Sequence, residues 1–153
     1  MLKIGSKAPG FSLPTDGNKE PDLFTLQGTP TVLFFYPKDD TPGCTTEAIG
    51  FSERIKDFEK LGVTVIGVSR DTVTKHAKFR AKHNLSVILG SDEDGKVCEA
   101  YGVWVEKNMY GRKYMGIERT TFLIDESGKI REIWRKVKVK GHVDAVYDAA
   151  AAL

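Results

Sequence analysis

The stretch Thr31-Val-Leu-Phe-Phe-Tyr-Pro-Lys-Asp-Asp-Thr-Pro-Gly-Cys44 decides the fold of this chain. Its first six residues form an unbroken β-branched and aromatic run, which is typical of a strand buried on both faces. Pro37 ends that run, and the following KDDTPG has the composition of a turn. Apolar side chains then recur at close to helical spacing over 43–60. We therefore expect a strand, a loop and a helix, with Cys44 in the first turn of that helix.

The rest of the chain repeats this alternation of strand and helix. Asp125-Glu-Ser-Gly128 separates two further apolar runs and has the composition of a hairpin turn. Strand–helix crossovers followed by an antiparallel hairpin predict an α/β, thioredoxin-like fold, in which helices flank a central mixed β-sheet within one domain spanning 1–153. The expected strands are 31–36, 63–68, 86–89, 120–124 and 130–137, and the expected helices are 43–60, 71–83 (starting at Asp71 or Thr72), 96–101 and the alanine-rich C-terminus.

The remaining segments are expected to be loops or edges. Residues 10–30 predict a small hairpin-like entry to the domain. A long polar loop is expected around Trp104 to Tyr114, and we expect it to pack on the protein rather than to line the site or contact a reductant. The run Arg135-Lys-Val-Lys-Val-Lys140 alternates as a half-exposed edge strand does. The apolar alternations of the entry segment are Phe11, Leu13, Phe24 and Leu26.

Composition excludes several classes of function. With 153 residues, the chain is long enough to bury a sizeable core. Lysines and arginines number 23 against 21 aspartates and glutamates, so the net charge of +2 predicts no nucleic-acid or anionic-lipid partner. Two cysteines can supply neither a disulfide-rich scaffold nor a four-cysteine zinc site. Because no apolar run is long enough for a signal peptide or a membrane helix, we expect a cytoplasmic protein without a membrane partner.

The thiol of Cys44 is the leading candidate for chemistry. The carboxyl ends of strands are where reactive groups gather in open α/β sheets, and Cys44 follows such an end. The positive end of the helix dipole favours the thiolate, which is the nucleophilic form of cysteine. Asp39 and Asp40 oppose this effect if they lie close. A nearby cation is therefore expected.

Topology suggests that Arg119 is that cation. If strand 120–124 runs antiparallel beside 31–36, its beginning, where Arg119 stands, lies at the sheet end where Cys44 emerges. A guanidinium at that point would stabilise a thiolate and polarise an oxygen substrate. Thr41 can offer a hydroxyl three residues before Cys44, although it also suits a plain turn. Glu47 shares a helix face with Cys44 and could orient Arg119, or could simply lie on a solvated face.

The motif Pro37-x-x-x-Thr41-x-x-Cys44 resembles the signature of the peroxiredoxins. The longer runs FFYPKDDTPGCTTEA (34–48) and GIERTTFLID (116–125) resemble the bacterioferritin comigratory protein, or peroxiredoxin Q, branch of that family. The resemblance implies a thiol-dependent peroxidase that reduces hydrogen peroxide and organic hydroperoxides through a cysteine sulfenic acid. It implies neither a metal nor an organic cofactor. Thioredoxin, glutaredoxin or glutathione is the implied reductant, and a monomer is expected.

The same resemblance implies roles for individual residues. Cys44 would be the peroxidatic cysteine that attacks the distal peroxide oxygen. Thr41 and Arg119 would bind the two peroxide oxygens, with Glu47 behind them. Pro37 and Pro42 would pack around the thiolate and limit its access to solvent.

The chain departs from the family at the resolving cysteine. Many members carry it five residues after the peroxidatic cysteine, where this chain has Ile49. Others carry it in the next helix, near Arg80 of this chain. Only Cys98 remains, and its neighbourhood predicts a packed, inert thiol. We therefore expect a one-cysteine mechanism in which an external thiol resolves the sulfenic acid, with pairing of Cys44 and Cys98 as the less favoured alternative.

Two other functions compete with the peroxidase. A thioredoxin-like disulfide oxidoreductase needs C-x-x-C, whereas this chain has Thr41-Pro-Gly-Cys44, and threonine cannot resolve a mixed disulfide. A non-catalytic thiol chaperone or peroxide sensor would keep the thiol without turnover. His76 and His83 lie seven residues apart on a Lys/Arg-rich helix, and we expect a solvated face there rather than a metal site.

Overall fold

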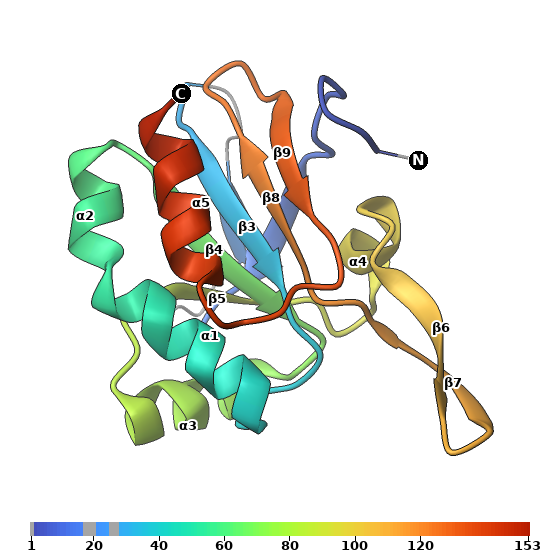
Figure 1. Ribbon diagram of the computed structural model, residues 1–153. Helices are drawn as coiled ribbons and strands as arrows, with labels where there is room; N and C mark the ends of the chain where they lie inside the picture. Colours follow the sequence, from blue (N-terminus) through green and yellow to red (C-terminus); the bar gives the residue numbers. More distant parts are fainter. Residues whose placement is uncertain (1, 17–20, 25–27) are drawn as a thin grey trace.

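The computed structural model describes residues 2–16, 21–24 and 28–153. A five-stranded sheet runs through the molecule in the order β5 (Ile88–Ser91), β4 (Thr64–Ser69), β3 (Thr31–Phe35), β8 (Thr120–Ile124) and β9 (Ile130–Trp134) (Figure 1). β3, β4 and β5 run parallel, whereas β8 runs antiparallel to both of its neighbours. The mixed sheet and the strand positions confirm the predicted α/β architecture.

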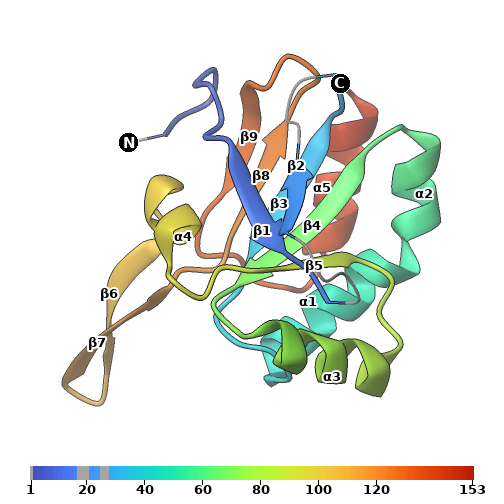
Figure 2. The same cartoon turned by 180° about the vertical axis from the view of Figure 1, so that it is seen from behind.

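Different elements cover the two faces of the sheet. Four helices cover one face, and the hairpin-like entry and a short helix lie over the other (Figures 1 and 2). The first group is α1 (Pro42–Glu53), α2 (Ile55–Lys60), α3 (Val73–His83) and α5 (His142–Ala151), and the second is β1 (Phe11–Pro14), β2 (Pro21–Phe24) and α4 (Lys96–Ala100). The ribbon of β6 (Trp104–Met109) and β7 (Arg112–Ile117) projects from the body of the molecule (Figure 1).

The central strand β3 supplies both cores by alternation. Phe34 belongs to the cluster on the helix side, and Phe35 belongs to the cluster on the opposite side. Both side chains are fully buried, as the unbroken apolar run predicts. Gly67 of β4 makes room for one of them, because a Cβ atom at Gly67 would lie 2.5 Å from Cζ of Phe34.

The strand register brings two distant segments to one end of the sheet. Phe35 at the end of β3 pairs with Thr120 at the start of β8. The loop that leads into α1 therefore meets the Glu118–Arg119 connection between β7 and β8. This is the antiparallel pairing that the sequence predicts, and it determines where the candidate site lies.

Several helix and strand bounds differ from the sequence-based expectation. The helix expected over 43–60 is two helices, because Arg54 leaves the helical conformation (φ −103°, ψ 10°). The expected strand 130–137 ends at Trp134, and the edge strand expected over Arg135–Lys140 is absent from the described residues. Lys136 has a positive φ of 48° there, which an extended strand does not accommodate.

The segment after Trp104 is a β-ribbon, so the prediction of a long loop was wrong. Tyr110 and Gly111 both have positive φ (53° and 80°), which is the geometry of a tight hairpin turn. Most side chains of the ribbon are exposed on both faces, so the strands show no apolar–polar alternation.

The entry hairpin is confirmed by the antiparallel pairing of β1 with β2, although Leu26 lies outside the described residues. Within the described part of the chain, no helix has the length and apolar character needed to cross a membrane.

Candidate active site

Cys44 occupies the first turn of α1 at the end of the central strand. Thr41 is the N-cap residue, and Pro42 at the first helical position fixes φ where no backbone donor is needed. The thiol is 1% exposed. Its Sγ accepts a hydrogen bond from Nη2 of Arg119 at 3.2 Å. A helix N-terminus and a guanidinium thus act on one sulfur, and both favour the thiolate.

Arg119 bridges Cys44 and Glu47. It reaches the site from the two-residue connection between β7 and β8, as predicted from the strand order. Its Nη1 donates to Oε1 of Glu47 at 2.7 Å. Gly43 leaves room for this approach, because a Cβ atom at Gly43 would lie 3.0 Å from Nη2 of Arg119.

Two effects set the pKa values around Cys44: the burial of the ionisable side chains and the positive charge of Arg119. Burial raises the pKa of Glu47 to about 7, although Arg119 acts in the opposite direction. Burial alone would lower the pKa of Arg119, but Glu47 and Cys44 outweigh it and raise that pKa above its ordinary value. On β6, burial followed by repulsion from Arg119 lowers the pKa of Lys107, while Cys44 raises it. Lys107 is therefore close enough to respond to the site.

The other residues of the motif lie around the helix start. Thr41 is half-buried, and its hydroxyl donates to the carbonyl of Lys38 at 2.8 Å. Pro37 is half-buried and Pro42 is exposed. The structure thus brings Arg119 into contact with both Cys44 and Glu47, while the hydroxyl of Thr41 bonds within the loop.

A cleft of about 480 Å³ opens beside Pro37. Three positive side chains and the acidic Glu93 line it together with apolar side chains of the β6–β7 ribbon. The ribbon also carries exposed apolar groups, and Tyr110 at its tip is fully exposed. The cleft is lined in part by Lys38, Arg70, Lys107, Trp104, Tyr114 and Met115.

Cys98 lies on the other side of the sheet. It belongs to the cluster that packs against Phe35, whereas Cys44 belongs to the cluster that packs against Phe34. Both thiols are free. Burial, and then Asp92, raises the pKa of Cys98 far above its ordinary value. The central sheet therefore separates the thiol of Cys98 from that of Cys44 in this conformation.

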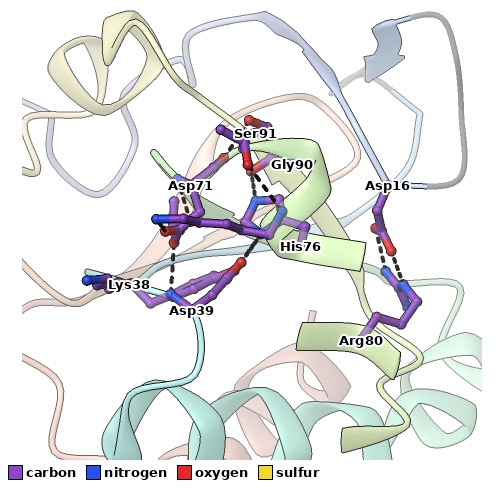
Figure 3. Close-up of polar contacts among 12 residues, drawn as sticks. Asp16, Lys38, Asp39, Asp71, His76, Arg80, Gly90 and Ser91 are labelled. Carbon is purple, nitrogen blue, oxygen red and sulfur yellow. Dashed lines mark hydrogen bonds and ion pairs between the residues drawn. The ribbon is translucent and has the colours of Figure 1, made fainter. Parts of the chain in front are cut away.

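A buried polar network holds the loop that precedes Cys44 (Figure 3). Tyr36 donates to Oδ1 of Asp39 at 2.6 Å, and Nδ1 of His76 lies 2.6 Å from Oδ2 of the same carboxylate. Nε2 of His76 donates to the carbonyl of Gly90 at 3.1 Å. His76 is fully buried, so the expectation of a solvated face was wrong for this residue. It faces inward because the i+3 position, Phe79, lies in the core.

Asp71 joins Asp39 and His76 in a cluster that has the spacing of metal ligands. The donor atoms of Asp39, Asp71 and His76 lie within 4.8 Å of one another. Their oxygens already have partners, since Oδ2 of Asp71 accepts from the backbone of Asp39 at 2.8 Å and from Ser69 at 2.7 Å. The cluster therefore acts as a hydrogen-bonded anchor for the loop.

The next aspartate of the loop is also bound to α3. Asp40 accepts from Lys82 at 2.7 Å and contacts Nε2 of His83 at 2.8 Å. Consecutive aspartates of the Cys44 loop thus pair with the two histidines that share one face of α3. The prediction of a shared face was correct, but its partner is the loop rather than solvent.

Arg80, the second position at which the resemblance led us to look for a resolving cysteine, forms a clamp (Figure 3). Its guanidinium binds both carboxylate oxygens of Asp16. It also donates to the carbonyls of Leu85 at 2.7 Å and Val87 at 2.6 Å. These bonds tie α3 to the segment that leads into β5 and to Asp16, which follows β1.

Sequence reasoning missed His76 and His142. His142 is buried on α5, and its Nε2 lies 4.0 Å from Oε2 of Glu47. The i, i+3 spacing of His76 and Phe79 could have indicated a buried face. For His142, a histidine directly after Gly141 at the start of a helix is a weak signal, because its contact depends on how α5 packs.

The chain matches known proteins over nearly its whole length. Residues 4–133 match the AhpC/TSA family. The chain is 49% identical over 142 residues to Peroxiredoxin Bcp of Bacillus subtilis, covering 93% of this chain and 90% of that protein. A mutant of PrxQ from Xylella fastidiosa has a TM-score of 0.92 at 39% identity, over 99% of this chain and 97% of that one. A Xanthomonas campestris bacterioferritin comigratory protein, studied for alkyl peroxide reduction, has a TM-score of 0.87 at 42% identity, over 99% of this chain and 96% of that one.

Proposed function

The chain belongs to the AhpC/TSA family and is a peroxiredoxin with thiol peroxidase activity, and we propose that Cys44 is the residue that attacks the peroxide. The observation that carries this proposal is the 3.2 Å contact between Nη2 of Arg119 and Sγ of Cys44 at a helix N-terminus. A cation and a helix dipole acting on a buried sulfur stabilise the thiolate, which is the form that attacks.

The proposed oxidation step needs only groups of this site. The Cys44 thiolate attacks the distal oxygen of the peroxide, so that an S–O bond forms and the O–O bond breaks. The electron pair of the O–O bond leaves with the other oxygen, which takes a proton and departs as water or an alcohol. Cys44 becomes a sulfenic acid. Arg119 stabilises the charge that develops on the leaving oxygen.

The neighbouring residues take supporting roles in this proposal. Glu47 holds the guanidinium of Arg119 in place through its Oε1. The hydroxyl of Thr41 turns from the carbonyl of Lys38 to bind a peroxide oxygen. Pro37 and Pro42 flank the entrance to the thiol.

An external thiol resolves the sulfenic acid in a one-cysteine cycle. Its thiolate attacks the sulfenic sulfur, so a mixed disulfide forms and water leaves after protonation. A second thiol then attacks the mixed disulfide and releases Cys44. The position of Cys98 across the sheet and the rise in its pKa support this cycle, since an intramolecular disulfide needs the two Cα atoms within about 7 Å.

The external thiol is thioredoxin, glutaredoxin or glutathione in this proposal, and the surface beside Cys44 favours a protein. The ribbon exposes Met109, Tyr110, Tyr114 and Met115 next to the cleft that contains Pro37. Exposed apolar groups gathered in this way are typical of contact surfaces. Met109→Ser combined with Tyr110→Ser should slow turnover with thioredoxin or glutaredoxin and spare turnover with glutathione. Equal rates with all three donors would exclude the ribbon as a docking surface.

Steady-state turnover of Cys44→Ser, with Cys98→Ser as the matched control, tests the proposed function. Cys44→Ser should consume no peroxide with any thiol donor, and Cys98→Ser should retain the wild-type rate. Disulfide reduction without peroxide consumption would favour the oxidoreductase alternative. A wild-type chain that is oxidised once without turnover would favour the sensor or chaperone.

A further inference from the structure

Glu47 has one carboxylate oxygen without a partner. Among the described residues, its Oε2 is the only buried side-chain nitrogen or oxygen that forms no hydrogen bond. The other oxygen, Oε1, accepts from Arg119. An unsatisfied buried carboxylate oxygen is costly, and a proton on that oxygen removes the charge that makes it so.

His142 faces this oxygen from α5. Its Nε2 lies 4.0 Å from Oε2 of Glu47 and 2.9 Å from Oγ1 of Thr121, so the threonine hydroxyl is within reach of the imidazole. The rings of Phe51 and Trp134 pack edge-on against His142 and fix its orientation. The imidazole is thus a second titratable group beside Oε2, whereas Arg119 binds Oε1.

One half-buried cation serves two potential anions in this site. Arg119 contacts both the sulfur of Cys44 and the carboxyl group of Glu47, so it can neutralise one full negative charge. Burial raises the pKa of Glu47 to about 7 and, together with Arg119, lowers the pKa of His142 to about 4. Between these values a neutral acid lies beside a neutral base. Lys107 is the other cation near the group.

We propose that Glu47 and His142 form a proton-exchange pair that keeps the charge of the Cys44–Arg119 site constant through the catalytic cycle. This inference rests on the proposed roles of Cys44 and Arg119. Glu47 and His142 do not touch the peroxide, so both are positioning residues. They act through the guanidinium that binds the reacting sulfur.

The charges balance in each half of the cycle. Before oxidation Cys44 is a thiolate, Arg119 is positive and Glu47 carries a proton on Oε2. Oxidation forms the S–O bond, breaks the O–O bond and leaves Cys44 neutral, while the leaving oxygen takes a proton from solvent. Glu47 then ionises, and its Oε2 gives the proton to Nε2 of His142, 4.0 Å away, from which the proton passes to solvent. When the external thiol restores the thiolate, Glu47 takes a proton back.

Infrared difference spectroscopy tests the role of Glu47. The reduced chain should show the carbonyl band of a protonated carboxyl group at pH 6, and stoichiometric peroxide should remove that band. Glu47→Gln should lack the change, whereas Glu53→Gln, an exposed position on the same helix, should keep it. A carbonyl band that survives oxidation, or a loss of the band that persists in Glu47→Gln, would overturn the proposal that Glu47 releases its proton. If Cys44→Ser instead still turned over peroxide, the proposed function itself would fail.

Stopped-flow mixing with a pH indicator tests the role of His142. At a pH where absorbance shows Cys44 to be a thiolate and Glu47 holds its proton, wild-type oxidation should cause no net proton uptake. Glu47→Gln should take up a proton per sulfenic acid formed. His142→Gln should show the same uptake followed by a slow release, because the path from Glu47 is interrupted. A His142→Gln trace that matches the wild type would exclude His142 from the exchange.

Discussion

Replacing Glu47 with glutamine should stabilise the fold increasingly as the pH rises. The carboxyl group is fully buried, and burial raises its pKa from 4.5 to about 7. Between these values the unfolded chain has released the proton while the folded chain still holds it. This group therefore destabilises the folded state progressively as the pH rises through that interval, and the cost persists at higher pH.

The shift sets the size of the effect. A difference of about 2.5 pKa units corresponds to about 3 kcal/mol at 1.36 kcal/mol per unit. Glutamine retains the oxygen that accepts from Arg119 but cannot ionise. The free energy of unfolding of Glu47→Gln, relative to the wild type, should therefore rise by about 3 kcal/mol between pH 4 and pH 8.

Urea denaturation of the reduced chains at several pH values measures this difference. Comparing variant with wild type at each pH cancels the titration of all other groups. Glu53→Gln, exposed on the same helix, should show a flat profile. A difference for Glu47→Gln that stays constant with pH, or that falls as the pH rises, would refute the account of a buried, protonated carboxyl group.

Three further substitutions test the geometry. Arg119→Ala should lower the rate constant for oxidation by peroxide by about 10²–10³-fold in stopped-flow measurements, and an unchanged rate would remove Arg119 from the mechanism. Gly43→Ala should slow the same step by pushing the guanidinium from Sγ, whereas Gly10→Ala, where a Cβ atom meets nothing within 4 Å, should not. His76→Ala should destabilise the fold by about 3 kcal/mol in urea denaturation, since it leaves Oδ2 of the buried Asp39 without the imidazole. His83→Ala, which breaks the more exposed pair with Asp40, should cost less than about 1 kcal/mol. Equal losses for the two variants would contradict the distinction between a buried and an exposed pair.

The sequence allowed the contact between Cys44 and Arg119 to be predicted because strand pairing is a long-range constraint that two apolar runs reveal. Once 120–124 lies antiparallel beside 31–36, Arg119 must stand at the end where Cys44 emerges. Glu47 followed from the i, i+3 spacing on one helix. Both predictions depend only on the regular spacing of residues in strands and helices, which can be read directly from the sequence.

The features that sequence reasoning missed depend on packing between elements. His142 reaches Glu47 only because α5 crosses α1, and no spacing in the sequence encodes that crossing. His76 was assigned to solvent because lysines surround it along α3, yet the acceptor atoms that bury it come from a loop and a distant strand. The β6–β7 ribbon lacks alternation because both faces meet solvent, and its turn uses Tyr110 where asparagine or aspartate is usual.

Intact-mass spectrometry after one equivalent of peroxide tests the central claim most directly. The account predicts that the chain gains one oxygen atom, that an added thiol traps this product as a mixed disulfide, and that Cys44→Ser shows neither change. Loss of two hydrogens within one chain would mean that Cys44 and Cys98 pair. An oxygen gained equally by Cys44→Ser would place the reactive group elsewhere, and either result would contradict the mechanism.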